Sequence, residues 1–241
     1  MPEIPQTAPS APPTEASTDE KPASKRRPYR WSWPLLVFLT ILLAILLPAR
    51  SSLGDWNDVP SVSMEPNIFT GDRIWINKLA YDLKFPFTKW QLARWADPQR
   101  GDIVVFYSPQ DGTRMVKRII GLPGDEIAMM RNKVFINQKR LEYTPLFHNQ
   151  LHRFAVEHRP DHQSVIMVTP RARARKRFPP VQVPEGHYLI LGDNRDLSAD
   201  YRTFGFVPRA DIEGRATSVV MSFDTDNGWS PRWERFFTEL P

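Results

Sequence analysis

A chain of 241 residues can hold one domain of ordinary size, or two small ones, in addition to an apolar segment. It contains no cysteine, which excludes disulfides, cysteine-based metal sites and a thiol nucleophile. Its 32 Lys and Arg residues against 27 Asp and Glu residues give a net charge of +5, and the excess is concentrated at residues 25–30 and 171–177. Because the first basic patch adjoins an apolar stretch, we expect a membrane rather than a nucleic acid as its partner.

Residues 1–30 are predicted to form a disordered cytoplasmic tail with a basic flank. The first part, residues 1–24, is rich in Pro, Ser, Thr, Ala and Glu. Such a segment cannot bury enough apolar surface to offset the entropy lost on ordering. The flank at residues 25–30 carries the first cluster of Lys and Arg.

Residues 31–49 are predicted to form a transmembrane helix. Residues 31–48 are an uncharged run of 18 residues, near the lower end of the length that spans a bilayer. The basic flank before the run, against a lone Arg50 after it, predicts a cytoplasmic N-terminus, a single pass and an external C-terminal domain. A cleaved signal peptide is disfavoured by the long segment ahead of the run and by the poor cleavage pair Leu47 and Ala49. A buried core helix is disfavoured because the run is apolar on every face.

Residues 50–241 are predicted to form an all-β domain without a long helix. Gly-Asp pairs precede several short β-type runs, and each pair is typical of a corner between strands, because Gly accepts a positive φ and Asp caps its own turn. The pairs are Gly71-Asp72, Gly101-Asp102 and Gly124-Asp125. The predicted strands cover residues 73–76, 103–106, 115–120, 133–136, 164–168, 188–191 and 218–223.

The segment Pro60-Ser61-Val62-Ser63-Met64-Glu65-Pro66 places two serines two residues apart, with Ser63 lying 16 residues beyond Leu47. In an extended segment, residues two apart face the same way. One hydroxyl could then attack a carbonyl while the other, with a backbone N–H, donates to the developing oxyanion. The alternative is a turn, where serines near proline are common.

Lys117 is predicted to lie on a strand between Met115 and Ile119, with Arg118 on the opposite face. Burial between apolar neighbours disfavours the charged ammonium. Bringing a lysine near neutrality takes a shift of about three pKa units, roughly 4 kcal/mol. Such a lysine can activate a serine directly as a general base. The alternative is a lysine whose stem lies on the sheet while its ammonium reaches water.

Residues 192–202 read Gly-Asp-Asn-Arg-Asp-Leu-Ser-Ala-Asp-Tyr-Arg and alternate acids with arginines. These charges can pair within the segment and stiffen a loop. The alternative is a solvated charged turn.

Together these segments resemble the bacterial type I signal peptidases, membrane-anchored Ser/Lys endopeptidases that remove signal peptides. The matching segments keep the order of the family's sequence boxes, from Trp33 to about Phe223. They are residues 60–66 for the nucleophile box, 100–106 for the next box, 115–125 for the lysine box, 192–202 for the Gly-Asp-Asn-Arg-Asp box and 214–216 within the closing strand.

The resemblance implies a role for each site residue. Ser63 is implied to be the nucleophile and Lys117 the general base. Ser61 is implied to donate to the oxyanion beside the Ser63 N–H, and Ser198 to orient Lys117. The residues implied to hold the site together are Asp193, Arg195, Asp196, Asp200 and Arg202.

The resemblance also implies a domain of coiled antiparallel sheets in the periplasm or outside the cell, anchored in the inner membrane. Cleavage would follow small-x-small (Ala-x-Ala) sites through an acyl-enzyme, with no metal and no organic cofactor. The implied partners are signal peptides of exported preproteins, the lipid bilayer and the secretion machinery, and no nucleic acid.

Three alternatives stay open at this point. One is a Ser/Lys peptidase with a narrower task, such as a single pilin or conjugation factor. Another is a Ser-His-Asp site that uses His187. The third is an inactive, membrane-anchored binding homologue, favoured by Leu197 where Asn is usual in the family and by Tyr201 where a small residue is usual.

An insertion at about residues 142–180 contains four histidines and the second basic patch. The i,i+4 spacing of His148 with His152, and of His158 with His162, would put each pair on one helix face for a metal, although no tight acidic cluster accompanies them. The basic patch at residues 171–177 is predicted to be a solvated loop, with contact to anionic lipid or to a secretion partner as the alternative.

Two aromatic segments raise the question of membrane contact. Residues 81–95 carry Phe85, Phe87, Trp90 and Trp95 among Lys and Arg. We hypothesise that this segment rests in the membrane interface, with core packing as the alternative. Residues 229–237 invite the same interpretation.

Overall fold

The computed structural model describes residues 32–85, 88 and 90–241, without the side chains of residues 32 and 45–51. The chain divides into two units, Met1–Leu42 and Leu43–Pro241. The predicted tail at residues 1–30 lies outside the described residues, and so does Phe87 of the aromatic segment.

The apolar run forms the helix α1 (Ser32–Ser52). Its described large apolar side chains, between residues 33 and 43, are all exposed. Within the described part of the chain, no helix is both long enough and apolar enough to cross a membrane.

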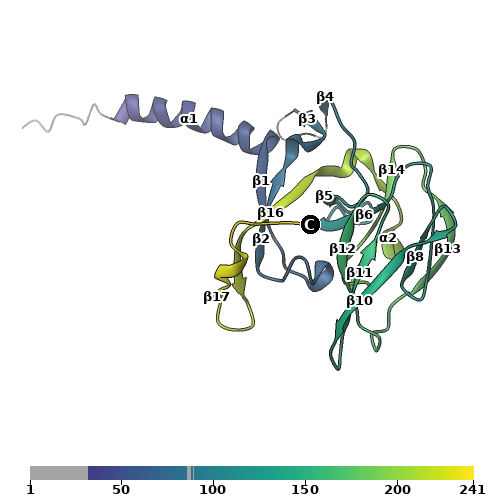
Figure 1. The fold of residues 1–241 in the computed structure, drawn as a ribbon. Coiled ribbons are helices and arrows are strands. Elements are labelled where there is room, and N and C mark those ends of the chain that lie inside the picture. Colours follow the sequence, from purple (N-terminus) through teal and green to yellow (C-terminus); the bar gives the residue numbers. More distant parts are fainter. Residues whose placement is uncertain (1–31, 86–87, 89) are drawn as a thin grey trace, which may run out of the picture. The chain divides into compact units, whose positions relative to one another are not determined.

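Beyond the end of α1, the second unit is built almost entirely from antiparallel sheets, as the sequence predicts, and the α-helix described there is the single turn α2 (Tyr201–Phe204) (Figure 1). Among the described residues the largest sheet has nine strands in the order β1-β2-β16-β5-β6-β14-β15, with β17 and β18 also paired to β16. Its strands are β1 (Gly54–Asp58), β2 (Asp72–Asn77), β5 (Ile103–Tyr107), β6 (Arg114–Gly121), β14 (His187–Leu191), β15 (Val207–Pro208), β16 (Ile212–Asp224), β17 (Ser230–Pro231) and β18 (Thr238–Glu239).

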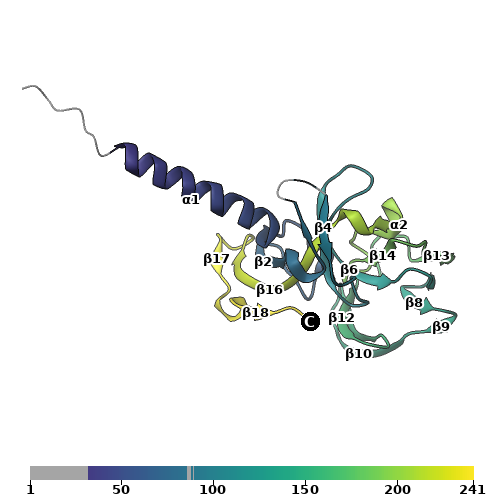
Figure 2. The ribbon, with the colours of Figure 1, turned by 90° about the horizontal axis from the view of Figure 1, so that it is seen from above.

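Three smaller sheets complete the unit. A four-stranded sheet has the order β13-β7-β8-β9 and a three-stranded sheet the order β10-β11-β12, while β3 and β4 form a hairpin. Figures 1 and 2 place β8 and β13 at the opposite end of the unit from β2. The bounds are β3 (Asp82–Lys84), β4 (Gln91–Arg94), β7 (Glu126–Met130), β8 (Lys133–Ile136), β9 (Lys139–Arg140), β10 (Glu142–His148), β11 (Arg153–His158), β12 (Gln163–Val168) and β13 (Arg177–Gln182).

The seven predicted strands are all present, in β2, β5, β6, β8, β12, β14 and β16. The Gly-Asp corners are also confirmed, because Gly71, Gly101 and Gly124 have φ values of 87°, 97° and 85°. The register of β16 against β2 shifts twice along its length. Such irregularities bend a strand, and β16 curves across the unit between β2 and β5 (Figure 1).

The helical spacing proposed for the histidines is wrong. Residues 142–168 form the three strands β10, β11 and β12, so residues four apart do not share a helix face. His148 ends β10, His158 ends β11, and His152 and His162 lie in or beside the turns that join these strands. The two i,i+4 pairs therefore give no helical metal site.

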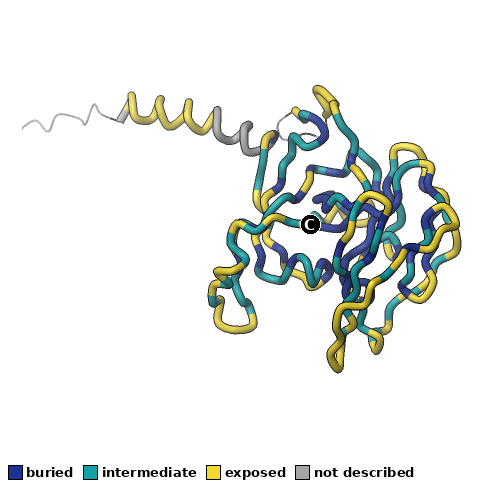
Figure 3. Tube along the Cα trace, viewed as in Figure 1, coloured by how far each residue is buried: buried dark blue, intermediate teal, exposed yellow. Residues whose placement is uncertain are grey.

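The strand β6 lies at the centre of the core. Buried residues concentrate along β5, β6 and β14, the dark central segments of Figure 3. Both faces of β6 are covered, because Val116 belongs to the cluster around Met64, Ile119 to the cluster around Phe106, and Ile120 to the cluster around Ile127. The side chains of residues 116–120 are therefore buried on either face of this strand.

Shortening a core side chain tests this packing. We expect Ile120→Ala to lower the free energy of unfolding by about 2–5 kcal/mol, because Ile120 is fully buried and its neighbours can close the space only in part. Leu146→Ala, at a half-exposed position of β10, is the matched control and should cost well below 1 kcal/mol. Urea unfolding of the chain in detergent measures both values. Equal losses would show that β6 is not central to the core.

Candidate active site

The serine segment contains a 3₁₀ turn in which Ser63 and Met64 are buried. Ser61 is extended, with φ −135° and ψ 152°, and the turn Val62–Met64 follows it. Met64 and Ile68 are buried in the core cluster beneath the turn. Because these apolar side chains fix the turn from below, Ser63 is held with only 7% of its surface exposed.

Lys117 meets this turn from β6. Its Nζ lies 2.7 Å from Ser63 Oγ and donates a second hydrogen bond to the Val116 carbonyl at 2.8 Å. The lysine is 2% exposed. Burial lowers the pKa of Lys117 to about 8, against the raising effect of the Asp200 and Asp193 carboxylates. Its neutral form is therefore accessible at moderately alkaline pH, with a serine hydroxyl in hydrogen-bond reach.

The second serine lies beside the first. The Oγ atoms of Ser61 and Ser63 are 3.2 Å apart, and Ser61 is exposed. This geometry leaves the Ser61 hydroxyl open to a group arriving from solvent. A hydroxyl in this position is suited to donate a hydrogen bond to an oxyanion that forms next to Ser63 Oγ.

Ser198 differs from the expected arrangement. Among the described residues its buried Oγ has no hydrogen-bond partner, and the hydrogen bonds of Lys117 go to Ser63 and Val116 instead. Ser198 packs against Gly192, where an added Cβ would come within 2.3 Å of Ser198 Oγ and 2.5 Å of the Ser63 carbonyl oxygen. The hydrogen bond from Ser198 to Lys117 that the family resemblance implies is therefore not among the contacts of the described residues.

Residues 192–202 form a buried loop rather than a solvated turn. The Asp200 carboxylate binds Arg202 through both oxygens and accepts from the Gly192 N–H, so pairing within the loop is confirmed here. Asp193 instead forms a two-bond ion pair with Arg118 of β6, at 2.9 and 2.8 Å. For Asp193 the prediction of pairing within the loop is wrong, because its partner comes from the central strand.

Two other loop residues also bind partners elsewhere. Arg195 makes a two-bond ion pair with Glu157 of β11, at 2.6 and 2.7 Å. Asp196 accepts from the Asn132 amide and from the Thr169 N–H, both at 2.8–2.9 Å. The loop is therefore tied to several elements at once.

The sequence analysis missed two charged residues of this network, Arg118 and Glu157. Arg118 carried a signal, since it adjoins Lys117 and was placed on the opposite face of the strand, where it indeed meets Asp193. Glu157 carried none, because nothing in the sequence of β11 marks one acid as buried.

The departures from the family pattern have structural explanations. Tyr201 packs between Phe178 and Phe206, with ring centroids 5.1 and 4.8 Å away. Asn67 donates to the Asp193 carboxylate at 2.7 Å and so supports the loop. Leu197 is partly exposed. The Ser63–Lys117 contact is formed with Leu197 and Tyr201 both present.

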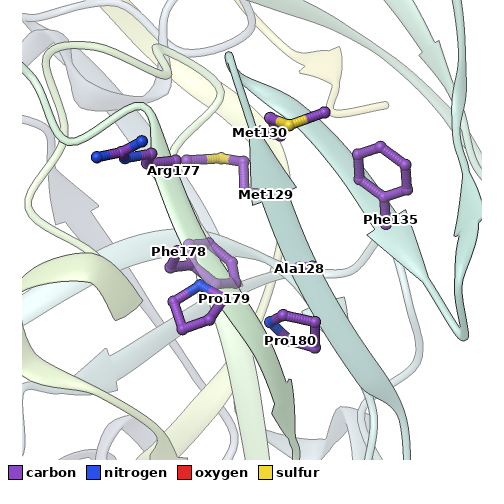
Figure 4. Close-up of a pocket in the computed structure, with 8 residues that line it drawn as sticks. All are labelled: Ala128, Met129, Met130, Phe135, Arg177, Phe178, Pro179 and Pro180. Carbon is purple, nitrogen blue, oxygen red and sulfur yellow. The ribbon is translucent and has the colours of Figure 1, made fainter.

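Two cavities of the unit have largely apolar walls. One of about 560 Å³ lies between β7 and β13, with Met129, Met130, Phe135 and Phe178 among its walls (Figure 4). Another of about 590 Å³ is lined by Val59 and Pro60, directly before Ser61, and is also largely apolar. The second one provides an apolar surface next to the serine segment.

His187 takes no part in this arrangement. Its Nδ1 is 2.9 Å from the Glu185 carbonyl oxygen, and the contacts found for Ser63 Oγ in the described residues are to Lys117 and Ser61. A Ser-His-Asp site built on His187 is not formed.

The chain matches known proteins over most of its length. A family model described as signal peptidase, peptidase S26, matches residues 30–221. The signal peptidase I of Pseudomonas fluorescens is 36% identical, over 79% of this chain and 74% of its own. That of Buchnera aphidicola from Acyrthosiphon pisum is 32% identical, over 81% and 77%. That of Haemophilus influenzae is 30% identical, over 92% and 79%. Because the family model covers residues 30–221 and these relatives are 30–36% identical over most of the chain, the chain belongs to the signal peptidase family, peptidase S26.

Proposed function

We propose that this chain removes N-terminal signal peptides from exported preproteins, with Ser63 as nucleophile and Lys117 as general base. Membership of the family supports a serine endopeptidase of this class. The observation that carries the assignment of residues is the 2.7 Å contact between Lys117 Nζ and Ser63 Oγ, two residues that are both buried. Cleavage after small-x-small sites, Ala-x-Ala above all, follows from the family resemblance.

The reaction begins with neutral Lys117. Its Nζ takes the proton of Ser63 as Oγ attacks the carbonyl carbon of the scissile bond. The Ser63 N–H and the Ser61 hydroxyl donate to the oxyanion. Protonated Lys117 then gives its proton to the amine of the departing mature protein, and water hydrolyses the Ser63 ester with Lys117 again as base. The Val116 carbonyl keeps Nζ aimed at Ser63 throughout.

The loop at residues 192–202 supports this chemistry. Asp193, Arg195, Asp196, Asp200 and Arg202 are proposed to hold the loop, and Asp193 and Asp200 also oppose the fall in the Lys117 pKa. Ser198 is proposed to reach Lys117 once Nζ carries its extra proton, because its hydroxyl is buried beside Gly192 and unpaired among the described contacts.

We further propose that residues 31–49 anchor the chain in the inner membrane, with the N-terminus in the cytoplasm and the catalytic domain outside. The support is the uncharged run of 18 residues and the basic flank before it. The hairpin of β3 and β4 exposes Phe85, Trp90 and Trp95, and residues 229–237 expose Trp229, Trp233 and Phe237. Exposed aromatic side chains of this kind suit the bilayer interface. Contact of residues 171–177 with anionic lipid or secretion machinery is proposed on their charge alone.

An inactive binding homologue is disfavoured by the same geometry. A desolvated lysine is costly to keep, and the contact with Ser63 has no evident use in a scaffold protein. A peptidase with a narrower task shares this site and differs only in its substrates.

Replacing either member of the pair tests the assignment. We expect Ser63→Ala and Lys117→Ala each to lower kcat by about 10⁴-fold or more on a preprotein with an Ala-x-Ala site, because the two groups act as a unit. Ser61→Ala should cost about 10²-fold, the loss of one oxyanion donor. Lys139→Ala, an exposed lysine of β9, is the control and should cleave normally. A variant at Ser63 or Lys117 that cleaves like the parent chain would refute the assignment.

The pH dependence tests Lys117 separately. Its basic form is the neutral one, and with a pKa of about 8 the neutral fraction falls tenfold for each pH unit below that value. We expect log kcat/KM to rise with unit slope up to about pH 8 and then level off. At pH 5 about one thousandth of the plateau should remain. Retention of more than about a tenth of the plateau at pH 5, with the protein still folded, would contradict a neutral lysine base.

Membrane contact by the β3–β4 hairpin can be tested at Trp90, which is 68% exposed. We expect Trp90→Ala to slow processing of a preprotein in lipid vesicles several-fold, because an interfacial anchor is lost. Cleavage of a short soluble peptide in detergent should be unchanged. Leu146→Ala, an exposed apolar change on β10, is the control. Equal rates in vesicles would indicate that the hairpin stays clear of the bilayer.

A further inference from the structure

Glu157 is a buried acid in the insertion at residues 142–180, with no exposed surface. Its carboxylate accepts from Arg159 Nη1 at 2.6 Å, from both terminal nitrogens of Arg195 at 2.6 and 2.7 Å, and from the Tyr143 hydroxyl at 2.6 Å. Burial alone would raise the pKa of Glu157, but the two guanidiniums outweigh it and lower the pKa to about 2. The acid is therefore ionised wherever the protein is folded and working.

The link from Glu157 to Arg195 fixes one end of the 192–202 loop. Arg195 is also fully buried, and its backbone N–H donates to the Met167 carbonyl of β12 at 2.8 Å. The Met167 N–H donates in turn to the Asp193 carbonyl at 2.9 Å. These bonds form a short parallel bridge between Met167 and Asn194. Through this bridge, the loop pairs with β12 at the edge of the insertion's three-stranded sheet.

The same loop holds the backbone of the nucleophile. The Asn194 N–H donates to the Ser63 carbonyl at 3.2 Å, and the Asn194 side-chain amide donates to the Val62 carbonyl at 3.1 Å. Gly192 lies so close to the Ser63 carbonyl that a Cβ would come within 2.5 Å. A shift of the loop must therefore move Ser63.

Loss of the Glu157 charge would shift this loop. Arginine stays protonated even when buried, so it needs an anion or water. With the carboxylate gone, Arg195 is left as a buried charge without a counterion, which strongly favours its movement toward water. That movement would open the Met167 bridge, because both contacts are made by the same residue.

We infer that Glu157 is a positioning residue for the Ser63 nucleophile, acting through Arg195 and the 192–196 backbone, and that the insertion is a working part of the active site. This rests on the proposed role of Ser63. Lys117 and Ser63 do not touch Glu157, so its effect is transmitted through the loop.

The kinetic test compares Glu157→Gln with Glu142→Gln, the same change at an exposed acid of the same insertion. We expect Glu157→Gln to lower kcat per active site by about 10- to 100-fold, since small displacements of reacting groups cost that much, with KM little changed. Active sites are counted from the burst of product released from an ester substrate. Glu142→Gln should match the parent chain. An unchanged kcat per active site in Glu157→Gln would overturn the inference.

A double substitution tests the route through Arg195. If Glu157 acts on Ser63 by way of Arg195, the double variant Glu157→Gln/Arg195→Gln should be no slower than Arg195→Gln alone. Losses that multiply would show that Glu157 works by another route, and this too would overturn the inference.

Hydrogen exchange of the full chain in detergent separates this inference from the assignment of Ser63. In Glu157→Gln we expect faster exchange in peptides covering residues 60–68 and 189–197, and no change in Glu142→Gln. This result does not depend on which group attacks the substrate, so it stands even if Ser63→Ala keeps activity. Faster exchange confined to residues 142–168 would mean that Glu157 merely stabilises the insertion.

Tyr143→Phe serves if Glu157→Gln does not accumulate as folded protein. It removes one donor to the carboxylate and leaves both ion pairs in place. We expect faster exchange at residues 189–197 and a smaller fall in kcat than Glu157→Gln would give. Unchanged exchange at residues 189–197 would overturn the inference.

Discussion

The burial of two adjacent cations on β6 is the constraint that the rest of the site depends on. Lys117 and Arg118 point to opposite faces of a strand that is covered on both faces. Both side chains are therefore almost completely buried. A lysine can give up its proton when it is desolvated, whereas an arginine cannot. The hydrogen-bond partners of Lys117 and Arg118 differ in the same way. Arg118 receives the Asp193 carboxylate, while Lys117 receives only a hydroxyl and a carbonyl oxygen.

Because Arg118 stays charged, it needs a buried anion, and the loop at residues 192–202 supplies it as Asp193. The pair of Arg118 with Asp193 brings residues 75 positions apart into contact and ties the loop to β6. The loop then lies against the Ser63 turn, through Asn194 and Gly192. One strand thus carries the proposed base, Lys117, on one face and Arg118, the attachment for the loop that contacts the Ser63 turn, on the other.

Much of this arrangement was accessible from the sequence. The strands were predicted because runs of β-branched and aromatic residues and the Gly-Asp corners are local signals, and the opposite facing of Lys117 and Arg118 follows from strand geometry. The partner of Arg195 was not predictable, since a buried acid 38 residues away has no local signature. The helical pairing of histidines failed for the opposite reason. A spacing of four suggests one helix face, and these residues lie on strands and turns. The hydrogen bond expected from Ser198 depends on side-chain geometry that a sequence pattern does not specify.

Buried ion pairs of this kind contribute little net stability, because the cost of desolvating both charges offsets their attraction. They can nevertheless specify geometry, since displacing either partner leaves a charge alone in the interior. Within the insertion, the residues under this geometric constraint are on the side that faces the 192–202 loop. The strand β10 is largely exposed, whereas β12, at the edge that meets the loop, is mostly buried, with Ser164, Ile166 and Met167 inside. The exposed residues of the outer strand can therefore vary without moving Ser63, whereas Tyr143 of that strand donates to Glu157. Glu157 and the residues at the β12 edge cannot vary in this way, because they hold the loop that contacts Ser63.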